Sequence, residues 1–402
     1  MQLWRRNLYI LWGAVFLLMA AMSSIMPFLP LYIHQDMGIQ SEEQVAMWSG
    51  LIFGANFLTA FLFSPLWGKL SDKYGRKIMI LRSGFGMSIV ISLMGLATNV
   101  YHLLLLRLLN GMIAGFNPAA IALVATNTPK ERVGYALGML RSGAVAGSII
   151  GPFLGGFLAD YIGFRHIFFY TGVLILIAAI IVLFMVKEDF TPRETEESGS
   201  FVKDFKLIAG TQPLIQLFVV AFMIQFATLN VNPVLPLFVQ QLDPPGGRVS
   251  FFAGLVAAMA GFAEMMAAPR LGKLGDKIGP QKVLFYTMIG AALLFLPQGF
   301  STNIWQLLLW RFLLGLTVGG LLPSVNALTH RFAPKGLEST TFGYSNSATF
   351  LGNMIGPITG GFLAGHIGLN GVFFVTAILL LLNGIWTHIA VNKRIKALQT
   401  SN

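Results

Sequence analysis

The sequence of 402 residues contains no cysteine, few charged residues and few histidines. The lack of cysteine excludes disulfides, thiolate metal sites and cysteine nucleophiles. Only 11% of the residues are charged, against roughly 25% in soluble domains, which is too little charge to cover a water-soluble globule of this size. The 6 histidines show no HExxH or HxH spacing, which argues against a metal site.

Missing motifs narrow the class of function further. No Walker A stretch is present, so ATP is not expected to be the energy source. Nothing resembles a nucleophile elbow or a paired-carboxylate catalytic site, so the chain is not expected to be an enzyme.

The abundant residues are apolar, because 55% of the chain is hydrophobic and the mean hydropathy is +0.72. A membrane-spanning helix takes about 20 apolar residues, so a chain of this length has room for about twelve spans joined by short loops. We therefore predict an all-α polytopic membrane protein with lipid as its main solvent. The predicted spans lie near residues 8–34, 47–67, 78–98, 102–125, 134–159, 166–187, 212–240, 249–270, 282–300, 304–329, 340–365 and 371–391.

Basic residues are distributed unequally between the two sides of these spans. Of the 27 lysines and arginines, 22 fall at the termini or in connections on one side, and only Arg165 and Arg248 fall on the other. Positive residues collect in cytoplasmic loops, so this bias places both termini in the cytoplasm. The net charge of +11 then reflects membrane topology, and we expect no nucleic-acid partner.

An internal repeat divides the chain into two halves. The stretch 68–75 (GKLSDKYG) recurs at 272–279 (GKLGDKIG), and three further landmarks recur with shifts of 204 to 206 residues. An offset of six spans preserves direction, so both halves have the same orientation, as in transporters built from parallel repeats. We predict domains at 1–187 and 212–402, joined by a flexible, polar cytoplasmic linker at 188–211.

A ten-residue motif, GKLSDKYGRK, occupies the second connection at residues 68–77. It resembles the loop motif of the major facilitator superfamily, which implies a fold of two parallel six-helix bundles. Glycines permit a tight turn, and an aspartate can cap a helix end and pair with basic neighbours. The motif is therefore interpreted as a conformational latch, with a turn that carries basic anchors as the simpler alternative. The latch residues are Gly68, Asp72, Gly75, Arg76 and Lys77.

Small residues recur through the predicted fifth span. The pattern resembles the GxxxGPxxGG motif of the twelve-span drug:proton antiporters in the same superfamily, and its residues here are Gly143, Gly147, Gly151, Pro152 and Gly155. A stripe of small residues lets another helix approach closely, and helix packing alone is the alternative interpretation. We also expect Gly151-Pro152 to break the regular hydrogen-bond ladder and to bend the helix.

Resemblance to these antiporters implies a function and a location. The chain is expected to export lipophilic, often cationic or zwitterionic drugs in exchange for protons, by alternating access in a bacterial plasma membrane. The proton gradient would be the energy source, with no cofactor, and the chain would act as a monomer among membrane lipids. The alternative is a proton-coupled transporter of an endogenous metabolite or lipid on the same scaffold.

Two charged residues inside predicted spans point to a proton site. The fourth span resembles an antiporter motif centred on Arg107, with Asn110 where the family usually has glutamine. Glu264 is the only one of the 16 acidic residues that lies well inside a span. A lone carboxyl among apolar residues can take up and release a proton near neutral pH. We therefore predict Glu264 as the principal proton-binding residue.

Two alternatives to this assignment remain open. Arg141 lies in the fifth span at a depth similar to that of Glu264, so it either tunes Glu264, a role that Arg107 could also fill, or holds it in a purely structural ion pair. A different proton carrier would be Asp36, with His34 beside it near the outer end of the first span.

A substrate cavity is expected between the halves, because spans 1, 4, 7 and 10 line the cavity in the fold that the resemblance implies. Methionine and phenylalanine make an adaptable apolar lining, and a few amides add polar points. The predicted substrate-binding residues are Met26, Asn117, Gln225, Phe226, Asn230, Phe262, Met265, Asn326, Asn346 and Phe350.

Overall fold

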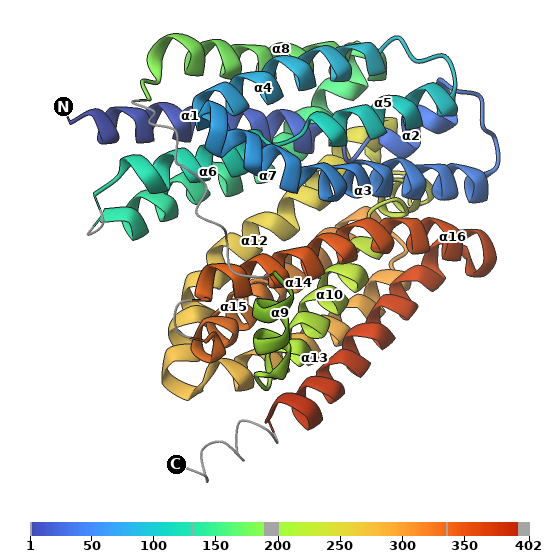
Figure 1. Cartoon of the computed structure of the whole chain (residues 1–402). Helices are drawn as coiled ribbons and strands as arrows, with labels where there is room; N and C mark the ends of the chain where they lie inside the picture. Colours follow the sequence, from blue (N-terminus) through green and yellow to red (C-terminus); the bar gives the residue numbers. More distant parts are fainter. Residues whose placement is uncertain (1, 130–131, 189–200, 335–336, 393–402) are drawn as a thin grey trace. The chain divides into compact units, whose positions relative to one another are not determined.

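A computed structural model describes residues 2–129, 132–188, 201–334 and 337–392, and within these ranges it contains helices and no strand (Figure 1). Eleven helical segments of the described chain are long and apolar enough to cross a membrane. Large apolar side chains remain exposed along them, such as Phe184 at 78% and Ile89 at 62% of their surface. Such surfaces are stable in lipid and not in water, so the predicted all-α membrane fold is confirmed.

The helices follow one another with short connections. Their bounds are α1 (Leu3–Ser24), α2 (Leu29–Gln35), α3 (Glu42–Tyr74), α4 (Arg76–Met94), α5 (Val100–Ile113), α6 (Phe116–Asn127), α7 (Val133–Ile162), α8 (Phe164–Met185), α9 (Phe201–Gly210), α10 (Leu214–Asn230), α11 (Leu235–Gln241), α12 (Val249–Ile278), α13 (Pro280–Gly299), α14 (Ile304–Val318), α15 (Leu321–Phe332) and α16 (Glu338–Trp386).

The last helix, α16, contains two of the twelve predicted spans. It is 49 residues long, and Gly368 inside it has non-helical dihedral angles, with φ 75° and ψ 169°. Figure 1 shows the red ribbon turning back on itself within α16. Eleven long segments therefore accommodate the spans predicted at 340–365 and 371–391 as well as the ten before them.

Four spans are broken into two shorter helices, and they are the first, fourth, seventh and tenth. Pro27 and Pro233 lie in the breaks of the first and seventh spans, where a proline cannot continue the hydrogen-bond ladder. Glycines occupy the other two breaks, including Gly115 with φ 151°, a value that side-chain-bearing residues rarely adopt. The breaks comprise residues 25–28, 114–115, 231–234 and 319–320.

The fifth span is not interrupted. The sequence predicted that Gly151-Pro152 breaks the hydrogen-bond ladder and bends the helix, and α7 is helical from Val133 to Ile162 with Pro152 inside it. The proline, which has no N–H, therefore does not divide the span, since membrane helices tolerate proline, and the bend stays a prediction.

The internal repeat extends to backbone geometry. Gly75 and Gly279 both turn the chain in the second connection of their half, with φ of 95° and 98°. Asn99 and Asn303 both cap the helix that follows, each accepting a hydrogen bond from the backbone N–H three residues on. Because these pairs are separated by 204 residues, the same local structure is encoded twice.

The chain divides into two compact units that take residues from both predicted halves. The first comprises Met1–Gln40, Ala55–Glu194 and Pro244–Ala258, and the second comprises Ser41–Gly54, Thr195–Asp243 and Met259–Asn402. In the first unit α1 packs on α7 and α8, and α4 packs on α8. In the second, α10 and α13 pack on α16. The first turns of α12 thus belong with the first unit, and those of α3 with the second.

The predicted flexible linker at 188–211 contains a helix. Residues 201–210 form α9, and Ile208 on it is fully buried. This part of the linker prediction was wrong, because the segment has enough apolar residues to bury one side of a helix against the bundle. The polar stretch 191–200 lies outside the described residues.

Candidate functional site

The fourth span carries a buried arginine beside a pair of amides. Arg107 in α5 is 5% exposed, and its Nε has no hydrogen-bond partner among the described residues. One turn further on, Asn110 Nδ2 donates a 2.8 Å hydrogen bond to Oδ1 of Asn56 in α3. Gly111 permits this approach, since a Cβ there would meet the Asn56 backbone. The asparagine that departs from the family pattern is therefore held by the second span.

The repeat-mate of Arg107 is Arg311 in α14, which is 8% exposed. Its Nε and Nη2 also have no hydrogen-bond partner in the described part of the chain. The position equivalent to Asn110 is Leu314, so the second half has no corresponding amide pair. Charged groups buried in membrane bundles are often part of functional sites, and both arginines are buried, so the proton-related role of Arg107 stays a prediction.

The glycines of α7 form one face that packs against α1. A Cβ added to Gly143 would lie 2.9 Å from the carbonyl oxygen of Trp12, and one on Gly155 would meet the Ser24 backbone. The glycines between them also contact α1 and are Gly147 and Gly151. In the second unit, Gly352 and its neighbours on α16 pack against α10 in the same manner. The close approach predicted from the glycine pattern is thus present in both repeats.

The glycine after this face contacts a different helix. Gly156 packs against Ser250 and Gly254 in the first turns of α12, within the first unit. The equivalent glycine of the second repeat, Gly361, packs against Ala46 in the first turns of α3, within the second unit. α7 and α16 therefore each pack against two other helices through their glycines, with one helix on each of two adjacent faces.

A carboxylate at the end of α7 caps the start of α12. Asp160 Oδ1 accepts a 3.3 Å hydrogen bond from the backbone N–H of Ser250, and Oδ2 accepts one of 2.9 Å from that of Phe251. These N–H groups have no partner within the helix, and a negative charge is stabilised by the helix dipole at this end. Asp160 also lines a pocket of about 470 Å³ together with Asp36 and His166.

Removal of this cap should weaken the attachment of α12 to α7. Asp160→Ala loses both acceptors, and we expect the apparent melting temperature of the purified protein to fall by about 2–4 °C, since a helix cap contributes about 1 kcal/mol. Asp160→Asn keeps one acceptor and should lose less. Asp36→Ala changes a carboxylate of the same pocket that accepts no hydrogen bond from a helix N-terminus among the described residues, and an equal loss there would contradict the capping role.

The predicted latch connects α3 to α4 through a tight turn. Gly75 adopts φ 95° between the two helices, as the motif required, and α4 begins at Arg76. The side chain of Asp72, to which the latch role is mainly assigned, lies outside the described side chains. The turn is therefore formed as expected, and the latch itself stays a prediction.

A residue that the sequence reasoning missed completes this turn. Glu188, just after the sixth span, accepts hydrogen bonds from the backbone N–H groups of Arg76 (3.0 Å) and Lys77 (2.7 Å). Lys77 Nζ in turn donates 2.9 Å to the carbonyl oxygen of Leu183. The sequence signal was an acidic residue directly after a span, which had been assigned only to the polar linker.

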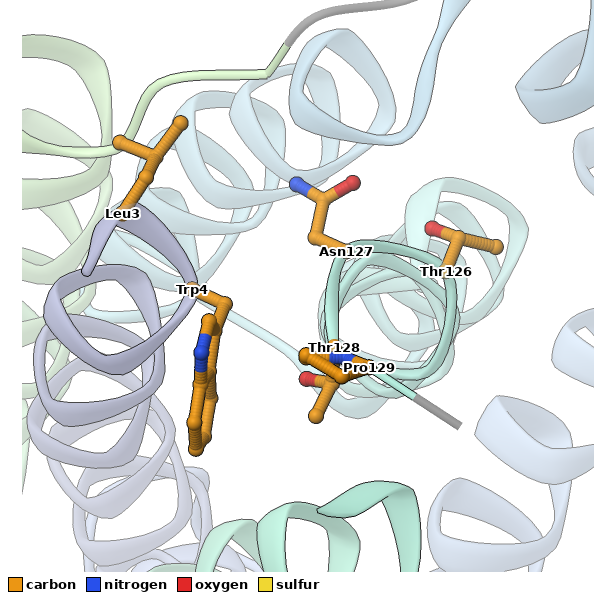
Figure 2. Close-up of a pocket in the computed structure, with 6 residues that line it drawn as sticks. All are labelled: Leu3, Trp4, Thr126, Asn127, Thr128 and Pro129. Carbon is orange, nitrogen blue, oxygen red and sulfur yellow. The ribbon is translucent and has the colours of Figure 1, made fainter. Parts of the chain in front are cut away.

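The start of α1 is attached to the end of α8. Asn7, 2% exposed, donates a 2.6 Å hydrogen bond to the Lys187 carbonyl and accepts one of 3.3 Å from the Lys187 backbone N–H. Beside this contact, Figure 2 shows a pocket of about 440 Å³ between the start of α1 and the end of α6. Its lining mixes polar, aromatic and aliphatic side chains, and comprises Leu3, Trp4, Thr126, Asn127, Thr128 and Pro129.

Two of the predicted proton-coupling residues, Glu264 and Arg141, lie on exposed faces of their helices. Glu264 is exposed on α12, in the second unit, next to Met265, and its backbone carbonyl packs against Gly319 at the tenth-span break. Arg141 is exposed on α7, in the first unit. A pairing of Glu264 with Arg141, and the tuning of Glu264 by Arg141 or Arg107, stay predictions.

The predicted substrate-binding residues differ in exposure. Asn230 is fully buried against Gly360, so it lines no open surface in this structure. Gln225 is partly exposed and donates 2.9 Å to Asn353 Oδ1. The remaining residues are partly or well exposed and are Met26, Asn117, Phe226, Phe262, Met265, Asn326, Asn346 and Phe350.

Comparison with known proteins identifies relatives along the whole chain. The family model described as Major Facilitator Superfamily matches residues 11–263 and 217–397. Multidrug resistance protein MdtG of Klebsiella pneumoniae (strain 342) is 41% identical over 390 residues, covering 97% of this chain and 94% of that protein. The MdtG protein of Salmonella schwarzengrund (strain CVM19633) is 41% identical over 396 residues, covering 98% of each.

Solved structures share the fold at low sequence identity. The nucleoside transporter NupG has a TM-score of 0.79 at 13% identity, covering 96% of this chain and 98% of that one. A bacterial homolog of the human lysosomal transporter Spinster has a TM-score of 0.80 at 16% identity, covering 98% of each chain. These similarities support the architecture alone, whereas the curated relatives and the family match extend to the sequence.

Proposed function

The chain belongs to the Major Facilitator Superfamily, and from this premise we propose that it is a multidrug exporter driven by protons. It is a transporter and not an enzyme. Its substrates would be lipophilic, often cationic or zwitterionic molecules. The observation that carries the proposal is the 41% identity to multidrug resistance proteins named MdtG over 97% of this chain.

The broken spans support a transport role. Discontinuous helices at the centre of a bundle leave backbone N–H and C=O groups available to substrates and ions. The four breaks occur in the first, fourth, seventh and tenth spans. Partly exposed Met26 lies in the first of these breaks, and partly exposed Phe226 lies five residues before the third. Both would offer an adaptable apolar contact to dissimilar substrates.

Proton coupling is the proposed energy source. A proton that enters down the gradient supplies roughly 2.3 kcal/mol per 100 mV of membrane potential. In the proposed mechanism Glu264 takes up and releases this proton, Arg107 or Arg141 tunes it, and the loop at 68–77 biases the alternation of access. The chain would act as a monomer in a bacterial plasma membrane, with both termini in the cytoplasm.

Dye transport in membrane vesicles tests this function. Energised inside-out vesicles that contain the chain should concentrate a lipophilic cationic dye, and a protonophore should reduce uptake to the level of vesicles without the chain. Concentrative uptake that persists with the protonophore would contradict proton coupling. No transport of either a cationic dye or a zwitterionic quinolone would contradict drug export.

A further inference from the structure

Two side chains from other helices hold the break in the fourth span. Trp67, near the end of α3, donates a 2.7 Å hydrogen bond from Nε1 to the carbonyl oxygen of Met112 in the last turn of α5. Arg82 in α4 stacks on the same indole, with its Cζ 3.4 Å from the ring centroid. Its Nη2 would lie 3.1 Å from a Cβ added to Gly115. One indole and one guanidinium therefore meet where the span is broken.

The guanidinium of Arg82 depends on this stack. Its Nε, Nη1 and Nη2 are all buried and have no hydrogen-bond partner within the described chain. A cation over an indole face gains more energy when both groups are shielded from water. Separation of Arg82 from Trp67 would leave a buried charge without compensation, so the two side chains are expected to move together.

The two residues flank the loop motif at 68–77. Trp67 immediately precedes the motif, and Arg82 follows its last residue by five positions. The stack therefore joins the two helices that the loop connects, and it joins them to the end of α5. We call the stacked pair Trp67–Arg82, with the hydrogen bond to Met112, the clamp. Because α5 also carries Arg107 and Asn110, the clamp lies between the loop motif and the buried arginine.

The second half has the same break without this clamp. Leu271 and Tyr286 occupy the positions equivalent to Trp67 and Arg82, each shifted by 204 residues, and Tyr286 is exposed. Methyl carbons of Leu271 and of Thr287, the residue after Tyr286, lie at the break at Gly320, where an added Cβ would lie 3.0 and 2.7 Å from them. Apolar packing is thus sufficient to hold a broken span. The cation–indole stack is an additional contact, and it occurs in the half that also contains Arg107 and the amide pair of Asn56 and Asn110.

We propose that Trp67 and Arg82 are positioning residues that couple the loop 68–77 to the break at 114–115. The proposal rests on the transport function proposed above. A loop movement that shifts α3 and α4 carries the stacked indole and guanidinium together away from the end of α5. It thereby releases the Met112 carbonyl and allows α5, with Arg107, to change its angle to α6.

A distance measurement tests this coupling without any substrate. The chain lacks cysteine, so spin labels can be attached at Lys69→Cys in the loop region and Ile121→Cys in α6, both exposed positions. The parent should give one narrow distance distribution. Arg82→Gln removes the charge and should broaden it about twofold or more, whereas Arg82→Lys keeps a cation over the ring and should restore most of the narrow distribution.

Matched variants separate coupling from packing. Thr287→Val changes a residue that lies at the break of the second half without changing a charge, and its distribution should equal that of the parent. Trp67→Phe keeps a ring under the guanidinium and removes only the N–H to Met112, so it should give an intermediate width even if Arg82→Gln does not fold. A parent-like width in both Arg82→Gln and Trp67→Phe, or equal broadening in Thr287→Val, would overturn the proposal.

Transport kinetics give a second measurement. Arg82→Gln should lower the maximal efflux rate about tenfold while the apparent KM stays within about twofold, because the clamp acts on the conformational step and contacts no substrate. An increase in KM at an unchanged maximal rate would contradict a positioning role. If the parent transports no dye, the proposed function fails, and the distance measurement still decides the coupling.

Discussion

Replacement of Gly155 by valine should abolish efflux and leave little folded protein in the membrane. Even a single added Cβ would meet the backbone of Ser24 in α1, and backbone cannot rotate away as a flexible side chain can. Overpacking costs about 1–3 kcal/mol where neighbours adjust, so we expect at least about 3 kcal/mol here. The measurements are the amount of protein that purifies as a monodisperse species, its apparent melting temperature and its efflux rate.

The same helix provides the matched control. Gly138 also lies in α7, but a Cβ added there finds no atom within 4 Å. Gly138→Val should therefore change stability by only about 0.5 kcal/mol and keep efflux near the parent level. Comparable losses in the two variants would show that helix propensity, and not the contact of α7 with α1, requires glycine.

Glu264→Gln should eliminate proton-driven, concentrative efflux while leaving substrate exchange intact. Glutamine has nearly the same shape as glutamate and keeps the oxygen acceptor, but it cannot take up or release a proton at physiological pH. The expected loss of gradient-driven transport is about 100-fold or more, because a conformational cycle without a titrating group cannot use the proton gradient. Efflux under an imposed pH gradient and substrate exchange without a gradient are measured on the same preparation.

A carboxylate outside the spans serves as control for Glu264. Asp243 has φ 45°, a conformation that asparagine also tolerates, so Asp243→Asn removes a charge at little structural cost. Its efflux should keep full proton dependence. If Glu264→Gln also keeps full proton dependence, the carrier lies elsewhere, and Asp36 becomes the next residue to replace.

The helix breaks illustrate how far sequence reasoning reaches. Pro27 and Pro233 indicated a repeated feature, yet Pro152 carries the same local signal and α7 stays helical through it. A proline removes one hydrogen bond in every case, and the packing around it determines whether the helix continues. The break at Gly115 is similar, because the side chains packed at it, Trp67 and Arg82, belong to other helices.

The sequence also did not predict which polar groups pair with one another inside the fold. Arg107 is buried, and the amide pair one turn further along α5 joins Asn110 to Asn56, which lies 54 residues away in the chain. Glu188 was counted with a polar linker, although it binds two backbone N–H groups 111 and 112 residues away. Such pairings leave no pattern in the local sequence, since a paired asparagine or glutamate near a span end cannot be distinguished from an unpaired one by its sequence neighbours.

The sequence by itself determined that this is a twelve-span membrane protein of two like-oriented repeats, because hydropathy, basic-residue bias and repeat spacing depend only on residue type and order. It also determined the family, through motifs that lie on single helices or turns. The tertiary structure alone decided which glycines pack against which helices, where spans break and which side chains hold the breaks. Those features depend on contacts between segments far apart in the chain, and only folding brings these segments together.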